Sequence, residues 1–516
     1  MTRPAVVRAA TGMAGATAVS RLLGLVRVLV IAGVLGTTYL GNTFLAANSV
    51  SNVLFELLAA GALSAVLVPA FVSRLDAGDR AGAERLAGGL LGLALGGLAV
   101  VTLGGMLGAG LLARVLTSGA GDPGVVPAQR ALATFLLVFF VPQVLCYAFG
   151  AVATAVLHAR RRFVVTAVAP MANSVVMIIS LFVFAAVAGS DPGLDLDVGA
   201  RLLLVVAGSG GVLAFVGVLV VAVARSGFRL RPRWGARDPD VRALVGHSTW
   251  GLALNAAAGL ILGAALVAGN GVAGGVVAYQ VAYVFFLAPY AILAQPISTT
   301  VLPELTVEAE TGHLAAFGNS VRWALGTTLR LVVPASVAMV VLARPAMEIV
   351  SFGAARDGGP ELLAAGVASL GAGLAPYACF MLLARASYAL GDSRTPALVA
   401  GAGAVLGVMV MFIGAAASEG AGLVVALGIG HSVAFTASTL ALWVHVARRV
   451  GSSLVPADLA VILVGGAALA LLGASAVRIF DPTGRLGSAA IVGVVGVVGV
   501  AGAAMLMRRA RRGRPA

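Results

Sequence analysis

The 516-residue sequence has no lysine, only two cysteines and few charged residues of any kind. Charged side chains make up 10% of the chain, whereas a soluble domain carries about a quarter. Hydrophobic residues account for 60%, and the mean hydropathy is +1.04. These values exclude a soluble globular protein, because most of the surface must contact hydrocarbon instead of water.

Patterns typical of enzymes and metal sites are absent from the sequence. It contains no HExxH motif, no Walker loop and no GxSxG placed on a strand. Cys146 and Cys379 lie far apart inside apolar segments, which predicts reduced, packed thiols without metal-ligand partners. The histidines show no metal-ligand spacing: His158, His247, His313, His431 and His445. We therefore expect no enzymatic activity, no metal site and no cofactor.

The net charge of +14 does not indicate a nucleic-acid partner. All 34 basic residues are arginines, and they lie in short clusters between apolar segments. A nucleic-acid groove needs a soluble scaffold, usually with aromatic residues between the basic ones. Neither feature is present, so no nucleic-acid binding is expected.

Apolar stretches of about 20 residues, the length that spans a bilayer, recur along the whole chain. Arg3 and Arg8 precede the first stretch as in a signal peptide, but no small-residue cleavage site follows, which favours a first transmembrane helix. The sequence predicts an all-α integral membrane protein with about 14 transmembrane helices. Their expected ranges are 12–36, 42–72, 84–116, 129–157, 163–188, 200–224, 241–269, 273–303, 318–343, 361–390, 395–417, 421–447, 457–477 and 486–507.

The arginines between these helices are distributed unequally. With the N-terminus inside, 23 arginines fall on the cytoplasmic side. Seven fall on the opposite side: Arg114, Arg130, Arg201, Arg344, Arg356, Arg478 and Arg485. Cytoplasmic loops of membrane proteins are enriched in arginine and lysine. The pattern predicts a multi-pass protein of the bacterial inner (plasma) membrane with both termini in the cytoplasm.

An internal repeat is visible in the spacing of a few residues. Three pairs share an offset of 234 positions: Pro69 and Pro303, Pro142 and Pro376, and Arg160 and Arg394. The offset predicts a six-helix lobe at 1–230 and a second at 240–450, related by an axis along the membrane normal. Two additional helices at 451–507 and an Arg-rich cytoplasmic tail at 508–516 would follow. The alternative is chance registry of prolines in a bundle that tolerates them.

Charged residues inside apolar helices are costly and usually line a cavity or form a pair. The first predicted helix contains Arg21 and Arg27, with Gly24 between them. On an ideal helix, two residues six positions apart point in directions that differ by about 120°. A hinge at Gly24 would direct both guanidiniums into one cavity, where they could bind a pyrophosphate bidentately. The alternative for Arg21 is that it extends to the cytoplasmic interface.

Glu56 lies midway along the second predicted helix, at a depth comparable to that of the two arginines. It could form an intramembrane ion pair with one of them, and the alternative is a pair with a purely structural role. Arg330 and Arg385 are the other arginines in apolar segments, and either could extend to the interface instead.

Several stretches resemble one known family. "AVSRLLGLVRVLVIAGVLG", followed by "NTFLAANSVSNVLFELLAAGALSAVLVPAF", is similar to the opening of the MurJ (MviN) lipid II flippases of the MOP transporter superfamily. "RRFVVTAVAPMANSVVMI", "TTVLPELT", "VLARPAMEIVSFG" and "RASYALGDSRTPALV" follow in the family's order over residues 15–400. The resemblance implies two six-helix lobes forming a V, two extra C-terminal helices and alternating access. The implied substrate is a polyprenyl-pyrophosphate-linked peptidoglycan precursor, and cell-wall synthesis proteins are implied as further partners.

Only some of the cavity residues of that family have a matching residue in this sequence. Ser20-Arg21 and Arg27 match its two helix-1 arginine motifs, whereas Asn42 replaces its usual acid. Phe55 and Glu56 stand where an arginine pair is expected, and Val284 stands where helix 8 has an arginine. The predicted cavity residues are Ser20, Arg21, Arg27, Asn42 and Glu56, with Gly24 as hinge. Two alternative functions stay open: a flippase or exporter of another polyprenyl-linked glycan or amphipathic compound, and a non-transporting scaffold in cell-wall assembly. Coupling of transport to the membrane potential or to an ion also stays open.

Overall fold

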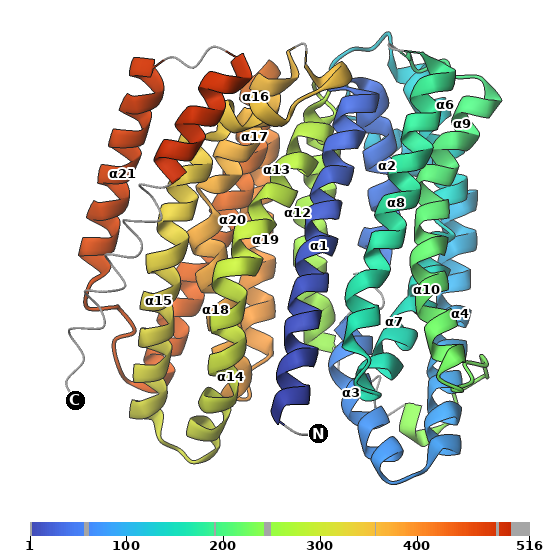
Figure 1. Cartoon of the computed structure of the whole chain (residues 1–516), viewed down its shortest axis with the longest axis vertical. Helices are drawn as coiled ribbons and strands as arrows, with labels where there is room; N and C mark the ends of the chain where they lie inside the picture. The colour runs from blue at the N-terminus through green and yellow to red at the C-terminus, as the bar shows by residue number, and fades with distance from the viewer. Residues whose placement is uncertain are drawn as a thin grey trace. The chain divides into compact units, whose positions relative to one another are not determined.

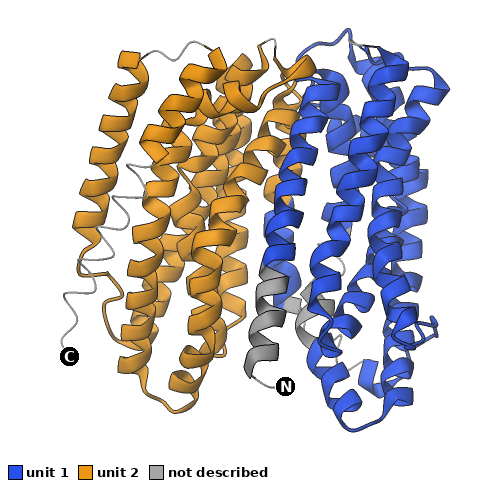
Figure 2. Ribbon diagram, viewed as in Figure 1, with its two compact units in different colours: residues 1–259 blue, residues 260–516 orange. Residues whose placement is uncertain are grey.

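The structure is a computed structural model that describes residues 3–55, 61–189, 192–241, 249–356, 358–480 and 484–496, with the backbone alone at 3–14, 55, 61–66 and 249. Nearly all of these residues lie in helices (Figure 1). A helix satisfies its backbone hydrogen bonds internally, as a chain surrounded by lipid requires. The prediction of an all-α membrane protein is confirmed. The chain divides into two compact units, residues 1–259 and 260–516 (Figure 2).

The first unit is built from long helices that are interrupted at a few positions. Its elements are α1 (Arg3–Leu35), α2 (Tyr39–Phe55), α3 (Gly61–Asp76), α4 (Arg80–Leu107), α5 (Ala109–Leu116), α6 (Val126–Phe140), α7 (Gln143–Ala159), α8 (Phe163–Ala188), α9 (Val198–Val205), the π-helix η2 (Val206–Gly210) and α10 (Gly211–Arg225). Helix α12 (Thr249–Gly269) begins within it.

The second unit continues the same architecture. Its elements are α13 (Gly275–Pro289), the π-helix η3 (Tyr290–Ala294), α14 (Gln295–Glu310), α15 (Leu314–Val341), α16 (Ala343–Val350), the 3-10 helix η4 (Gly353–Ala355), α17 (Gly359–Gly371), α18 (Leu374–Ala389), α19 (Arg394–Ala416), α20 (Gly420–Val450) and α21 (Leu459–Phe480). A shorter helix follows at Gly484–Gly496.

Eleven of the described helical segments are long and apolar enough to cross a bilayer, or twelve if α17 and α18, bent by 42°, form one span. The multi-span architecture is therefore confirmed, whereas a total of 14 spans stays a prediction. The expected spans at 42–72 and 486–507 both include residues outside the described ones.

Large apolar side chains are exposed along the spans. On α4, Val100, Leu103 and Leu107 are 73%, 60% and 82% exposed. On α21, Leu471 is 71% exposed. Such a surface would favour aggregation in water but is matched to lipid tails, which are as apolar as leucine.

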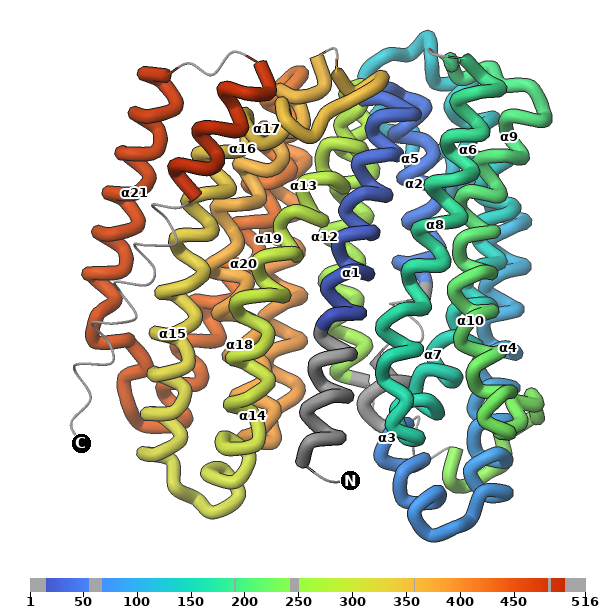
Figure 3. The backbone as a smooth tube through the Cα atoms, viewed as in Figure 1, coloured from blue at the N-terminus to red at the C-terminus, as the bar shows by residue number. Residues whose placement is uncertain are grey.

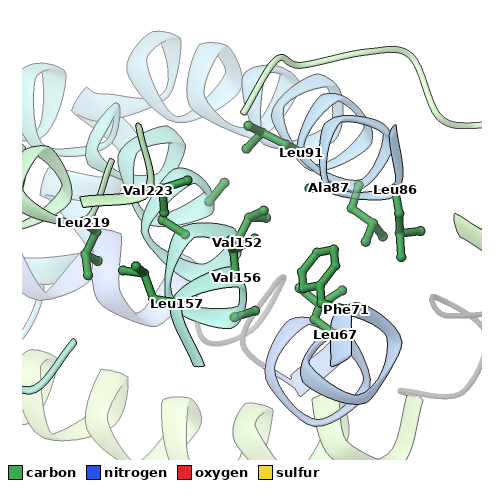
Figure 4. Close-up of a cluster of buried hydrophobic side chains, with 14 of the residues drawn as sticks. Leu67, Phe71, Leu86, Ala87, Leu91, Val152, Val156, Leu157, Leu219 and Val223 are labelled. Atoms are coloured by element: carbon green, nitrogen blue, oxygen red, sulfur yellow. The ribbon is translucent and has the colours of Figure 1, made fainter. Parts of the chain in front are cut away.

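Inside the first unit, α3, α4, α7 and α10 share a cluster of buried apolar side chains (Figure 4). Leu67 and Phe71 from α3 approach Leu86 and Ala87 of α4 in this view, and Phe71 is fully buried. Association of helices in lipid depends on close van der Waals packing, because lipid supplies no hydrophobic driving force between them. The cluster therefore fixes these helices relative to one another.

The break between α6 and α7 at Pro142 has defined partners for its backbone. Proline has no N–H and interrupts helical hydrogen bonding. The Ser51 hydroxyl donates to the Phe140 carbonyl at 2.6 Å, and the Ser209 hydroxyl donates to the Phe139 carbonyl at 2.9 Å. Gln143 Nε2 donates to Ser209 Oγ at 3.0 Å. The break is thereby anchored to α2 and to η2.

Candidate ligand cavity of the first unit

Five helices of the first unit enclose a cavity of about 300 Å³. Helix α1 packs along α8, as Figure 3 shows, and α2, α7 and α10 complete the walls. The cavity is lined by Ser20, Gly24, Arg27, Asn48, Asn52, Tyr147, Pro170, Asn173, Ser174, Met177, Val212 and Phe215. The lining is more polar than the exteriors of these helices, so the cavity is a candidate binding site.

Among the described residues that line the cavity, Arg27 is the only charged one. Its Nε atom is buried and has no hydrogen-bond partner, and no ion pair between described residues includes Arg27. An unpaired guanidinium in a low-dielectric region is costly unless an anion neutralises it. The cavity is therefore suited to an anionic group.

Ser20, Gly24 and Arg27 form one stripe on α1, because residues spaced by four and three positions share a helix face. All three line the cavity. Helix α1 runs without interruption through Gly24, and Arg21 is exposed and is not among the lining residues. In this conformation the structure brings together Ser20, Gly24 and Arg27, but not Arg21.

Two further predicted site residues lie elsewhere. Asn42 is fully buried in the first turn of α2, where its backbone N–H donates to the Thr38 carbonyl at 3.0 Å, and it does not line the cavity. Glu56 lies outside the described residues, so its pairing with an arginine stays a prediction.

Three asparagines that the sequence analysis did not select line the cavity. Asn48 and Asn52 are one turn apart on α2, and Asn173 lies on α8. Asn48 Oδ1 and Asn173 Oδ1 are buried without hydrogen-bond partners. The sequence did contain a signal for these asparagines. An amide side chain inside an apolar helix is costly for the same reason as a charge.

Two glycines of the η2–α10 segment allow these asparagines to pack closely. A Cβ on Gly211 would lie 2.3 Å from Asn173 Oδ1. A Cβ on Gly208 would lie 2.5 Å from the Phe140 ring and 3.1 Å from Asn48 Oδ1. The shape of the cavity wall therefore depends on the absence of side chains at Gly208 and Gly211.

The hydrogen-bonding inventory of the cavity favours an oxyanion. Ser20, Ser174 and Tyr147 carry hydroxyls, the asparagines carry N–H₂ groups, and Arg27 supplies a planar fork of donors. The lining that the structure describes includes no carboxylate. A phosphate or pyrophosphate could accept a bidentate contact from Arg27 and further bonds from these groups.

The two arginines singled out in the second unit have partners of their own. Arg330 Nε and Nη2 donate to the Asp458 carboxylate at 2.7 and 3.0 Å, joining α15 to the start of α21. Arg385 Nη1 donates to Thr299 Oγ1 at 2.9 Å, between α18 and α14. Both contacts hold neighbouring helices together, so neither arginine has the unpaired character of Arg27 Nε.

In the part of the chain that the structure describes, no group of three or more His, Cys, Asp or Glu side chains could hold a metal ion. Cys146 and Cys379 are both free thiols, as the sequence predicted.

The fold is shared with transporters of known structure. The chain resembles an inward-closed lipid II flippase MurJ, with a TM-score of 0.74 at 16% identity, covering 95% of this chain and 97% of that one. It also resembles an inward-facing multidrug resistance MATE transporter of the MOP superfamily, with a TM-score of 0.65 at 14% identity, covering 84% and 94%. The chain therefore has the multi-pass helical fold of these transporters.

The sequence places the chain within one branch of that class. The family model "Lipid II flippase MurJ" matches residues 31–493, and the chain belongs to that family, whose members are transporters and not enzymes. A probable lipid II flippase MurJ of Vibrio cholerae is 26% identical over 74% of this chain and 72% of its own length. The lipid II flippase MurJ of Burkholderia cenocepacia is 26% identical over 82% and 81%.

Proposed function

We propose that this protein translocates lipid II, the polyprenyl-pyrophosphate-linked peptidoglycan precursor, across the inner membrane by alternating access. The observation that carries the proposal is the buried Nε of Arg27, which has no hydrogen-bond partner among the described residues, in a cavity whose described lining contains no carboxylate. Membership of the MurJ family supports the choice of cargo.

Capture of the headgroup would begin at Arg27. The guanidinium binds the pyrophosphate bidentately, and Ser20 and Asn52 supply further donors within the same cavity. Arg21, exposed on the same helix, increases the local positive potential through which the anion approaches.

Release would need a competing anion, and Glu56 is the proposed one. When the cavity is empty, Glu56 pairs with Arg27 and reduces the cost of the buried charge. Binding of cargo displaces it and links headgroup capture to a rearrangement of α1 and α2. Glu56→Gln is then expected to retain or tighten cargo binding and to slow release, measured as the dissociation rate of labelled lipid II. Unchanged release would contradict this step.

The direct test is cargo binding by the purified full-length protein. Arg27→Ala is expected to weaken lipid II binding by about 2–5 kcal/mol, roughly 30-fold to several thousand-fold, since it removes a buried charged contact. Arg27→Lys should recover only part of the affinity, because a point charge does not reproduce the fork. Undecaprenyl pyrophosphate should compete for the site, whereas undecaprenol, which lacks phosphate, should not.

Arg114→Ala provides the matched control. Arg114 is an exposed arginine in the last turn of α5 and does not line the cavity. Its removal changes the net charge by the same amount and should leave binding unchanged. Equal affinities for wild type, Arg27→Ala and Arg114→Ala would refute anion capture in this cavity.

A further inference from the structure

His431 is a buried ionisable side chain in the second unit that the proposed capture of cargo does not use. It lies near the middle of α20 and is 3% exposed. Its Nδ1 is 2.9 Å from the Tyr279 hydroxyl of α13, and its Nε2 has no hydrogen-bond partner in the described part of the chain. A neutral imidazole has one donor and one acceptor nitrogen. Either tautomer therefore leaves one buried nitrogen unsatisfied, at a cost in stability.

Aromatic rings surround the imidazole on several sides. The ring centroids of Phe435, Phe286 and Tyr283 lie 5.0, 5.2 and 5.8 Å from that of His431. The Phe286 and Tyr283 rings stand at 81° and 67° to the imidazole plane. The imidazole is therefore enclosed by apolar ring surfaces and withdrawn from water. Such surroundings disfavour a charged ring that lacks a counter-charge.

An imidazolium would find only one full hydrogen-bond acceptor in this packing. Both of its nitrogens are donors, so Nδ1–H could donate to the Tyr279 oxygen. Nε2–H would then be directed among aromatic rings, which accept a weak hydrogen bond from N–H groups. Histidine is also the side chain whose charge changes near neutral pH. Ionisable residues within transmembrane helices commonly serve as ion or proton sites.

No carboxylate among the described residues contacts the ring. The titratable groups that face it are Tyr279 and Tyr283 of α13, with Tyr377 of α18 packed on Phe286 and Phe435. The other charged or titratable residues on the helices packed against α20 have no hydrogen bond or ring contact with His431: Arg322, Arg330, Glu361, Cys379, Arg385, Tyr388 and Arg394. The packed state therefore offers a charged His431 no counter-charge among the described residues, so protonation requires a rearrangement around the ring.

We propose that His431 is a proton-binding site that is empty in the packed state seen here and filled in another state of the second unit. A ligand that binds one conformation better shifts the equilibrium towards it. Proton binding at Nε2 or Nδ1 is thereby coupled to repacking of α20 against α13. This proposal depends on the proposed transport function only for the nature of the second conformation. The evidence for the site itself is the geometry around His431.

The test compares amide hydrogen exchange of α13 and α20 in the purified full-length protein between pH 5 and 8. Wild type is expected to show a pH-dependent step in exchange at these two helices. His431→Gln should lose the step while retaining the fold. His313→Gln is the matched control, because His313 is exposed and bonded to Thr311 in a turn, and it should keep the step.

Tyr279→Phe tests the hydrogen bond separately from the histidine. It removes the hydrogen bond that holds the neutral ring in the packed state. Proton binding should then be about tenfold easier, which raises the midpoint by about one pH unit. The proposal is overturned if wild type and His431→Gln share the same step, or if wild type shows no step. A persistent step in Arg27→Ala protein that no longer binds lipid II would separate this site from the cargo site.

Discussion

At the scale of single residues, the shape of the cavity depends on glycines, which have no side chain, as much as on the side chains that line it. Gly211→Ala would place a Cβ 2.3 Å from Asn173 Oδ1, well inside contact distance. We expect it to lower stability by about 1–3 kcal/mol, as overpacking does, and to weaken cargo binding by displacing Asn173. Thermal unfolding in detergent and lipid II binding measure the two effects.

Gly217 on the same helix is the matched control, because a Cβ there would meet nothing within 4 Å. Gly217→Ala should keep the unfolding midpoint and the affinity of wild type. If both variants behave alike, the close approach of Gly211 to Asn173 has no role in shaping the cavity.

Sequence reasoning identified part of this cavity and missed another part for a physical reason. Ser20 and Arg27 stood out, since a charge in an apolar helix is conspicuous. Asn48 and Asn173 are neutral, and only the packing of α2 and α8 around the cavity shows that they share a site with Arg27. Where an exposed side chain such as Arg21 points also depends on whether α1 bends, which Gly24 permits but does not require.

At the scale of helices, the sequence predicted that the helices exist better than it predicted the breaks inside them. The expected span at 163–188 coincides with α8, because apolar length is written directly in the sequence. The span expected at 129–157 is divided into α6 and α7 at Pro142, a break that proline explains.

The π-helix η2 has no such local signal, as Val206–Gly210 contains no proline. Its conformation is tied to long-range contacts, namely the Ser209 hydroxyl on the Phe139 carbonyl and Gly208 against the Phe140 ring. Single π-turns often occur at functional sites. Here η2 precedes the wall formed by Val212 and Phe215. Such features follow from tertiary packing, which hydropathy and helix propensity do not encode.

At the scale of the whole molecule, we propose that both termini and the loop at 225–242 are cytoplasmic, as the distribution of arginine predicts. In a background with Cys146→Ala and Cys379→Ala, cysteines placed at exposed Asp195 and exposed Arg237 form a matched pair. An impermeant thiol reagent added outside intact cells should label Asp195→Cys and spare Arg237→Cys. The reverse pattern would invert the proposed orientation.

The 234-residue repeat stays a proposal at this scale. Pro69 and Pro303 both lie inside helices, α3 and α14, whereas Arg160 follows the end of α7 and Arg394 begins α19. The proline pair supports a six-helix lobe at 1–230 and another at 240–450 that rock about a membrane-normal axis. An experimental structure in which the two lobes fail to superpose would contradict it.

The central claim, that this protein translocates lipid II through anion capture at Arg27, is tested most directly by the sidedness of labelled lipid II in spheroplasts depleted of the native flippase. Wild type and Arg114→Ala are expected to restore lipid II to the outer leaflet, whereas Arg27→Ala, present at normal levels in the membrane, should leave it inside. Full translocation by Arg27→Ala would contradict the capture mechanism. Failure of wild type itself would contradict lipid II as the cargo and favour a different substrate or a scaffold.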